Sequence, residues 1–206
     1  MEKFTELAAI AAPLLRQNVD TDIIIRIERL IGSKREQLGR YCFEAWRFGS
    51  DGAERPDFIL NTEPYRAARI LLAGDNFGCG SSREGAVWAL MGLGLRCVIA
   101  PSFGDIFHNN CYQNGMLPVA LPMPVIQSIA DQVMRDPLKK LVTVDLASCT
   151  VQAPDGERHQ FVIDPLRRKS LLEGLDEIGL SLLREAEIAA FQARDRRDRP
   201  WVYLAR

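Results

Sequence analysis

The stretch of sequence that decides the fold is residues 70–84, which read ILLAGDNFGCGSSRE. Ile70–Ala73 is an uninterrupted apolar run, and this pattern predicts a strand that is buried on both faces. The glycine-rich segment 74–80 predicts a turn, and a helix is predicted to follow from Ser82 to about Leu93, with Gly94 ending it. A buried strand that passes through such a turn into a helix is typical of open α/β sheets.

The same alternation continues toward the carboxyl end. Residues 96–100 and 116–121 predict two further buried strands. A helix over about 103–113, closed by Asn114-Gly115, is predicted to connect them, with Ser102 as its N-cap. Strands and helices that alternate through short connections predict a parallel sheet layered with helices.

The two ends of the chain carry weaker patterns. Residues 1–15 predict a first strand region, because Glu6 and Pro13 interrupt the apolar residues too early for a signal peptide. Residues 141–145 and 159–163 flank Asp155-Gly156 and predict a hairpin or an antiparallel pair. Residues 186–193 predict a late amphipathic helix.

Residues 33–66 are irregular in pattern, with several glycines and prolines, yet they contain Tyr41, Phe43, Trp46 and Phe48. A disordered linker would lack such aromatic residues, so we predict an ordered insertion with buried rings. The whole chain, 1–206, is predicted to form one domain with this insertion and a C-terminal helical arm over about 164–206.

Composition excludes several classes of protein. The 206 residues are 47% hydrophobic and 26% charged, and 26 basic side chains nearly balance 27 acidic ones. This balance argues against nucleic-acid or membrane-surface binding, and no apolar run approaches the roughly 18 residues of a membrane span. The five cysteines are scattered without a CxxC pair, which disfavours disulfides and a self-contained metal or iron–sulfur site. We therefore predict a cytoplasmic protein.

The turn at residues 74–84 is the first candidate site. It follows the carboxyl end of a predicted strand and opens a helix, where unpaired N–H groups favour an anion. Arg83 can grip a carboxylate with two hydrogen bonds. The alternative is structural, because Ser81 and Glu84 have the S-x-x-E spacing of a capping box. No dinucleotide or P-loop motif is present in register.

Two other polar segments are candidates. The first is Asn18–Asp22, whose side chains either close a turn or place two acids near a reactive centre. The second begins at Ser102 and includes His108 and several asparagines that either line a site or end a helix. His108 alone is a weak catalytic signal, and Cys79 is more typical of a small packed residue than of a nucleophile.

Taken in this order, the segments 18–24, 76–84 and 100–117 resemble the small subunits of 3-isopropylmalate dehydratase, also called isopropylmalate isomerase. The resemblance extends to Phe43 with Trp46-Arg47-Phe48 and to residues 174–180. These proteins correspond to the swivelling fourth domain of the aconitase superfamily. The resemblance therefore implies an α/β, swivelling β/β/α domain with a mixed sheet and layered helices.

The resemblance also implies a reaction and roles. The reaction is the isomerisation of 2-isopropylmalate and 3-isopropylmalate by dehydration and rehydration, in leucine biosynthesis. Ser81 would abstract a proton next to a carboxylate, Arg83 would bind a substrate carboxylate, and Asp22 would orient or charge-tune a group across the subunit interface. Further substrate contacts are expected from Ser82, Arg26, Asn76 and Gly80.

The same resemblance assigns the cofactor and the partner. This chain would bind no metal, and a four-iron four-sulfur cluster would lie on a separate large subunit. The two proteins would form a hetero-oligomer that acts on a small dicarboxylate.

The sequence departs from the family pattern at two places. Ile24-Ile25-Arg26 stands where the family has Ile-Ile-Pro-Lys, and Gly85 stands where it has a histidine. These changes leave open a paralogue that acts on citramalate, a dimethyl-substituted malate or a homoaconitate-type acid. A non-catalytic dicarboxylate-binding module is the remaining alternative.

Overall fold

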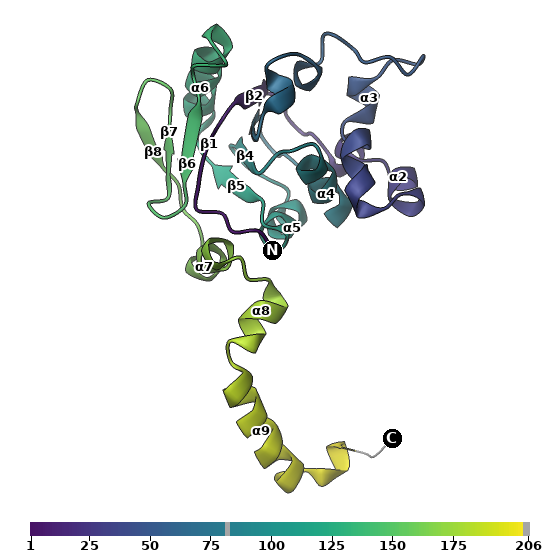
Figure 1. Ribbon diagram of the computed structural model, residues 1–206, viewed down its shortest axis with the longest axis vertical. Coiled ribbons are helices and arrows are strands. Elements are labelled where there is room, and N and C mark those ends of the chain that lie inside the picture. The colour runs from purple at the N-terminus through teal and green to yellow at the C-terminus, as the bar shows by residue number, and fades with distance from the viewer. Residues whose placement is uncertain (81–82, 204–206) are drawn as a thin grey trace.

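The computed structural model describes residues 1–80 and 83–203. It contains two four-stranded sheets and a layer of helices (Figure 1). The strands are β1 (Glu6–Ala9), β2 (Ala11–Leu14), β3 (Ile70–Ala73), β4 (Cys97–Ala100), β5 (Leu117–Ala120), β6 (Val142–Asp145), β7 (Thr150–Gln152) and β8 (Arg158–Gln160). The helices are α1 (Thr21–Ile24), α2 (Ile27–Gly32), α3 (Glu44–Arg47), α4 (Glu84–Gly92), α5 (Asp105–Asn114), α6 (Met123–Arg135), α7 (Pro165–Glu173), α8 (Glu177–Leu182) and α9 (Glu185–Asp198). Short 3-10 helices are η1 (Arg35–Tyr41), η2 (Ile59–Asn61), η3 (Tyr65–Ala67) and η4 (Pro200–Val202).

The parallel sheet has the order β2-β3-β4-β5 and confirms the predicted alternation of strands and helices. Along β3, Leu71 and Ala73 face one core, while Ile70 and Leu72 face a second one. The first core lies under α4, α5 and the insertion, and the second lies against the other sheet and α6. Burial on both faces explains why these strands are continuous apolar runs.

The antiparallel sheet has the order β1-β6-β7-β8 and forms the outer layer with α6 beside it (Figure 1). The predicted pairing of 141–145 with 159–163 is wrong in detail, because β7 lies between β6 and β8 and pairs with both. The turn at Asp155-Gly156 joins β7 to β8. The β/β/α prediction is confirmed, but the predicted mixed sheet is replaced by two sheets, one with only parallel and one with only antiparallel pairs.

The two central helices lie close to their predicted positions. Helix α4 begins at Glu84, two residues after the predicted start. Helix α5 ends at Asn114, and Gly115 follows in the left-handed conformation, as predicted for a helix C-cap. The predicted N-cap at Ser102 is wrong: α5 begins after Gly104, and the Ser102 hydroxyl donates to Asp75 Oδ1 at 2.5 Å.

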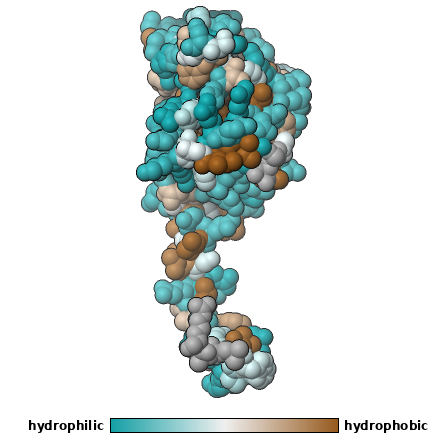
Figure 2. Space-filling model, turned by 90° about the vertical axis from the view of Figure 1, so that its right-hand side faces the viewer, coloured by the Kyte–Doolittle hydropathy of each residue, from teal (hydrophilic) through white to brown (hydrophobic). Residues whose placement is uncertain are grey.

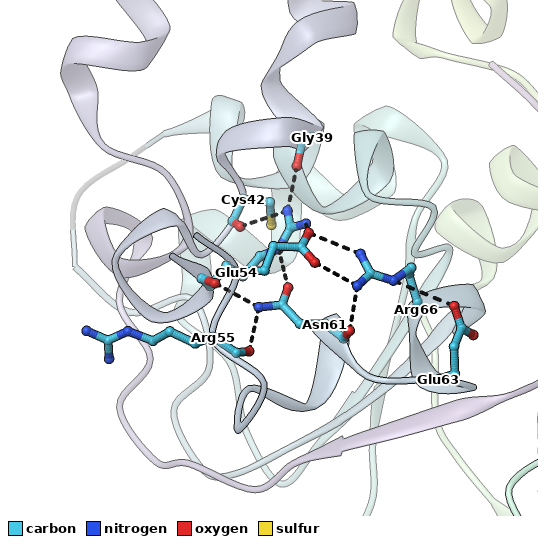
Figure 3. A network of polar contacts seen from close by, with 8 residues as sticks. Gly39, Cys42, Glu54, Arg55, Asn61, Glu63 and Arg66 are labelled. Atoms are coloured by element: carbon cyan, nitrogen blue, oxygen red, sulfur yellow. Dashed lines mark hydrogen bonds and ion pairs between the residues drawn. The ribbon is translucent and has the colours of Figure 1, made fainter. Parts of the chain in front are cut away.

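The insertion at 33–66 is ordered, as predicted, around Phe43 and a buried polar network (Figure 3). Arg47 is 7% exposed, and its Nε donates to Asn61 Oδ1 at 3.1 Å. The Asn61 amide nitrogen donates to the carbonyls of Arg47 and Arg55 at 2.7 and 2.9 Å. These contacts satisfy buried polar groups in a segment that has no strand ladder to do so.

The C-terminal arm formed by α8, α9 and η4 projects away from the two sheets (Figure 1). Helix α9 forms where a helix was predicted, but its apolar side chains remain exposed, and Asp195 is its one buried residue. Figure 2 shows apolar side chains on the arm; the exposed ones include Ile178, Leu182, Phe191 and Trp201. Among the described residues, no helix is long and apolar enough to cross a membrane.

Candidate functional site

The three polar segments found in the sequence lie side by side at one edge of the parallel sheet. Asn18 N–H donates to the Asp75 carbonyl at 2.9 Å, Gly78 N–H to Val19 at 2.7 Å, and Thr21 N–H to Cys79 at 3.0 Å. On the other side, Phe77 N–H donates to the Ser102 carbonyl at 3.1 Å. The carboxyl ends of parallel strands share an edge, so loops that follow β2, β3 and β4 meet there.

The loop after β3 needs glycine at Gly78. This residue has a φ of 72°, and a Cβ on it would lie 2.2 Å from the Phe107 ring. Any side chain would therefore push the loop off helix α5. Asn76 is held from both sides, because its N–H donates to Ser102 Oγ at 2.9 Å and its side-chain amide donates to Asn18 Oδ1 at 2.8 Å.

Asp22 and Arg83 form an ion pair within the chain. Asp22 lies on α1, which begins because the Asp20 carboxylate accepts from Ile23 N–H at 2.7 Å. The structural interpretation of the 18–22 segment is thus correct for Asp20, while Asp22 remains half-exposed. Gly80 adopts a φ of 94° beside Asp20. Ser81 and Ser82, predicted as base and substrate contact, lie outside the described residues.

Arg83 is the N-cap residue of α4, and no side-chain hydrogen bond caps the helix among the described residues. The Glu84 carboxylate accepts from Asn114 Nδ2 at 2.7 Å. The capping-box interpretation needs Glu84 as the third residue of the helix, whereas α4 begins at Glu84. Ser81, the other member of the box, lies outside the described residues. From the sequence, Asn114 was expected to close α5 or, with the other asparagines of its segment, to line a site, and its position before a glycine gave no signal of this side-chain contact.

Arg26 is exposed and lines a cavity of about 670 Å³ on the insertion. The other described lining residues are Arg40, Tyr41, Glu44, Ala45, Phe48, Gly49, Ser50 and Gly52. None of the lining residues that the structure describes belongs to 74–84, so the described lining of this cavity does not include the loop that carries Arg83.

The cysteines and His108 belong to the core and its margin. Cys42, Cys97 and Cys111 are buried, and burial raises the pKa of each thiol. These thiols pack as small apolar groups and are inaccessible to an iron–sulfur cluster. Among residues 1–80 and 83–203, no group of three or more His, Cys, Asp or Glu side chains is placed to hold a metal ion. Burial also lowers the pKa of His108, aided by the nearby Arg167.

Three family profiles match successive parts of the chain. Residues 1–124 match the Aconitase C-terminal domain, and residues 141–165 match LeuD_N. Residues 177–205 match the C-terminal domain of the 3-isopropylmalate dehydratase small subunit. The third match covers α8 and α9, so the arm is part of the family pattern.

Curated relatives match along the full length. The 3-isopropylmalate dehydratase small subunit of Rhodospirillum centenum is 53% identical over 202 residues, covering 98% of this chain and 99% of the relative. The small subunit of Paramagnetospirillum magneticum is 52% identical over 202 residues, covering 98% of this chain and 100% of the relative. A crystal structure of 3-isopropylmalate dehydratase from Methanocaldococcus jannaschii shares the fold, with a TM-score of 0.66 and 23% identity over 90% of this chain and 98% of that one. The chain belongs to the family of 3-isopropylmalate dehydratase small subunits.

Proposed function

We propose that this chain is the small subunit of a hydro-lyase that interconverts 2-isopropylmalate and 3-isopropylmalate in leucine biosynthesis. The observation that carries the proposal is the junction of three loops at the edge of the parallel sheet, which sets Arg83 and Asp22 beside the turn after β3. Full-length relatives named for this enzyme support the same reaction.

The reaction is an elimination followed by an addition. A proton leaves the carbon next to a carboxylate, hydroxide leaves the adjacent carbon, and a double bond and water result. Water then adds back with hydrogen and hydroxyl exchanged. Ser81, as an alkoxide, takes the proton and returns one, and the unpaired N–H groups of the first turn of α4 stabilise its charge.

Arg83 binds a substrate carboxylate through two charge-assisted hydrogen bonds. Asp22 holds the guanidinium before substrate arrives, which reduces the entropy lost on binding. Asn76, Gly80 and Ser82 make the further contacts to the substrate. Asn76 is already held in place by hydrogen bonds to Ser102 and Asn18. Arg26, on the insertion cavity, contacts substrate only after the two proteins close around it.

The partner is a large subunit that holds a four-iron four-sulfur cluster. When bound, the cluster supplies a Lewis acid for the substrate hydroxyl and carboxylate. The thiols of this chain are buried or scattered, so they do not fit as cluster ligands. Free cysteines and the absence of a membrane-spanning helix in the described part of the chain support a cytoplasmic complex.

The test is a hydratase assay on the chain co-expressed without oxygen with its large subunit. Isopropylmalate, citramalate, dimethylmalate and homoaconitate are offered in turn, and absorbance follows the unsaturated intermediate. The variants are Ser81→Ala, Arg83→Lys and Asp22→Asn. Arg158→Lys, at an exposed arginine of the antiparallel sheet, is the control for the general effect of replacing a guanidinium by an amine.

We expect turnover of isopropylmalate that Ser81→Ala abolishes. Asp22→Asn should lower kcat/KM by roughly 10- to 100-fold, because a hydrogen bond to a charged group contributes about 1.5–3 kcal/mol. Turnover of another acid alone would make the chain a paralogue. A cluster-loaded complex that turns over none of the four acids would favour a dicarboxylate-binding module.

A further inference from the structure

Asn114, a buried residue at the end of α5, is the centre of a hydrogen-bond network. It is 8% exposed. Its Oδ1 accepts from Trp88 Nε1 at 2.8 Å and from an Arg35 guanidinium nitrogen at 2.9 Å. Its Nδ2 donates to Glu84 Oε1 at 2.7 Å and to the Asn110 carbonyl at 3.0 Å. All four hydrogen-bonding positions of the amide are therefore occupied.

The partners fix the orientation of this amide. Tryptophan and arginine are donors only, so the oxygen must face Trp88 and Arg35. The nitrogen must then face the Glu84 carboxylate and the Asn110 carbonyl, which are acceptors. A flipped amide would place donors against donors and acceptors against acceptors, so one orientation is allowed.

The network is not needed to end the helix. Gly115, in the left-handed conformation, does that by donating its N–H to the carbonyls of Cys111 and Tyr112. The side chain of Asn114 is directed to other elements: the insertion through Arg35, the middle of α4 through Trp88, and the first turn of α4 through Glu84.

Glu84 connects the network to the candidate site. It is the first residue of α4, and Arg83 is the preceding N-cap residue. Glu84 is exposed, so without Asn114 its carboxylate would turn freely in solvent. The Arg83 side chain is held by Asp22, and its backbone is held through Glu84.

We infer that Asn114 is a positioning residue for substrate binding, acting through Glu84 to fix the backbone of Arg83. The inference rests on the proposed role of Arg83 as the carboxylate-binding residue. A displacement of about 1 Å at a binding group can cost up to roughly 100-fold in rate or affinity, so one hydrogen bond at the helix start has a measurable effect.

The experiment uses the complex with the large subunit and compares Asn114→Asp, Glu84→Gln and the double variant. Asn114→Asp sets two carboxylates against each other, whereas the double variant restores the bond with donor and acceptor exchanged. Glu84→Gln alone keeps an acceptor oxygen. Asn109→Asp is the matched control, because Asn109 is an exposed acceptor for Arg167 and aspartate remains one.

We expect Asn114→Asp to raise KM on the order of 10-fold with kcat changed less than about twofold, since carboxylate binding is made in ground and transition states alike. The double variant should recover most of this loss, Glu84→Gln should raise KM less than Asn114→Asp does, and Asn109→Asp should keep the native KM. If Asn114→Asp prevents assembly, Glu84→Ala, at an exposed residue, should produce the same rise in KM.

The two proposals fail in different ways. The positioning role alone is overturned if Arg83→Lys raises KM but Asn114→Asp leaves it unchanged. Where Glu84→Ala replaces Asn114→Asp, an unchanged KM in Glu84→Ala has the same meaning. A raised KM that the double variant does not rescue, with a lower Tm, also overturns it and assigns Asn114 to structure only. An unchanged KM in Arg83→Lys overturns the role of Arg83, and the inference falls with it.

Discussion

The side chain of Leu30 occupies the space beside Gly85 that any larger residue there would need. A Cβ on Gly85 would lie 2.3 Å from Leu30 Cδ2 and 2.9 Å from Cδ1. Leu30 belongs to α2 and packs against the first core. The space beside this glycine is thus filled by a leucine from a neighbouring helix.

We expect Gly85→Ala to lower the free energy of unfolding by about 1–3 kcal/mol, the usual cost of overpacking. Adding Leu30→Ala should make the pair less destabilising than the sum of the two single changes, because the clash disappears. Urea unfolding measures each variant. Gly32→Ala is the control, since nothing lies within 4 Å of that position; strict additivity would contradict the packing described.

Asn61→Leu should destabilise the insertion strongly. The change leaves the buried Arg47 Nε and two backbone carbonyls without their partner, at about 1–3 kcal/mol for each buried group. Thermal unfolding should show a large fall in Tm, whereas Glu63→Gln, at an exposed ion pair, should change it little. A small effect of Asn61→Leu would mean that water replaces the lost contacts.

His108 should make stability depend on pH below neutrality. Burial and Arg167 lower its pKa in the folded state, while Asp105 opposes the shift, and Tyr112 Oη lies 3.3 Å from Nε2. The unfolded chain therefore binds a proton at His108 more readily than the folded chain does, so the free energy of unfolding falls as the pH falls below about 6.5. The unfolding midpoint in urea, measured between pH 7.5 and 5.5, should vary less in His108→Gln than in the native chain. Equal slopes would remove His108 as the cause.

Removal of residues 184–206 should leave the sheets nearly as stable as before. The buried residue of α9, Asp195, accepts hydrogen bonds from Arg199 and Tyr203, which belong to the same arm. Loss of exposed contacts is worth about 0.5 kcal/mol or less, which is roughly 1–2 °C in Tm for a chain of this size. Leu171→Ala, in the second core, is the positive control for destabilisation. A fall as large as that of the control would show that the arm supports the body.

The elements that the sequence predicted well are those defined by local pattern. Strands β3, β4 and β5 are buried on both faces, so each appears as an apolar run bounded by turn residues. The three polar segments were recognised for the same reason, because each follows a strand or begins a helix.

The features that were missed depend on contacts between distant residues. Nothing near Ala9 or Ala11 signals that the chain passes from one sheet to the other there, and β7 is three residues long with one buried side chain. The pair Asp22 and Arg83 and the bond from Asn114 to Glu84 join residues 61 and 30 positions apart. Patterns within one segment carry no information about such partners.

The single residue between β1 and β2 has a consequence for how the protein is made. β1 pairs with β6, so the first strand has no partner until residues 142–145 have left the ribosome. At about 5–20 residues per second, the nascent chain waits roughly 7 to 27 seconds with this edge unpaired. Pairing between such distant segments has high contact order and is slow. β1 therefore stays without its partner strand for longer than β2, which pairs with residues 70–73.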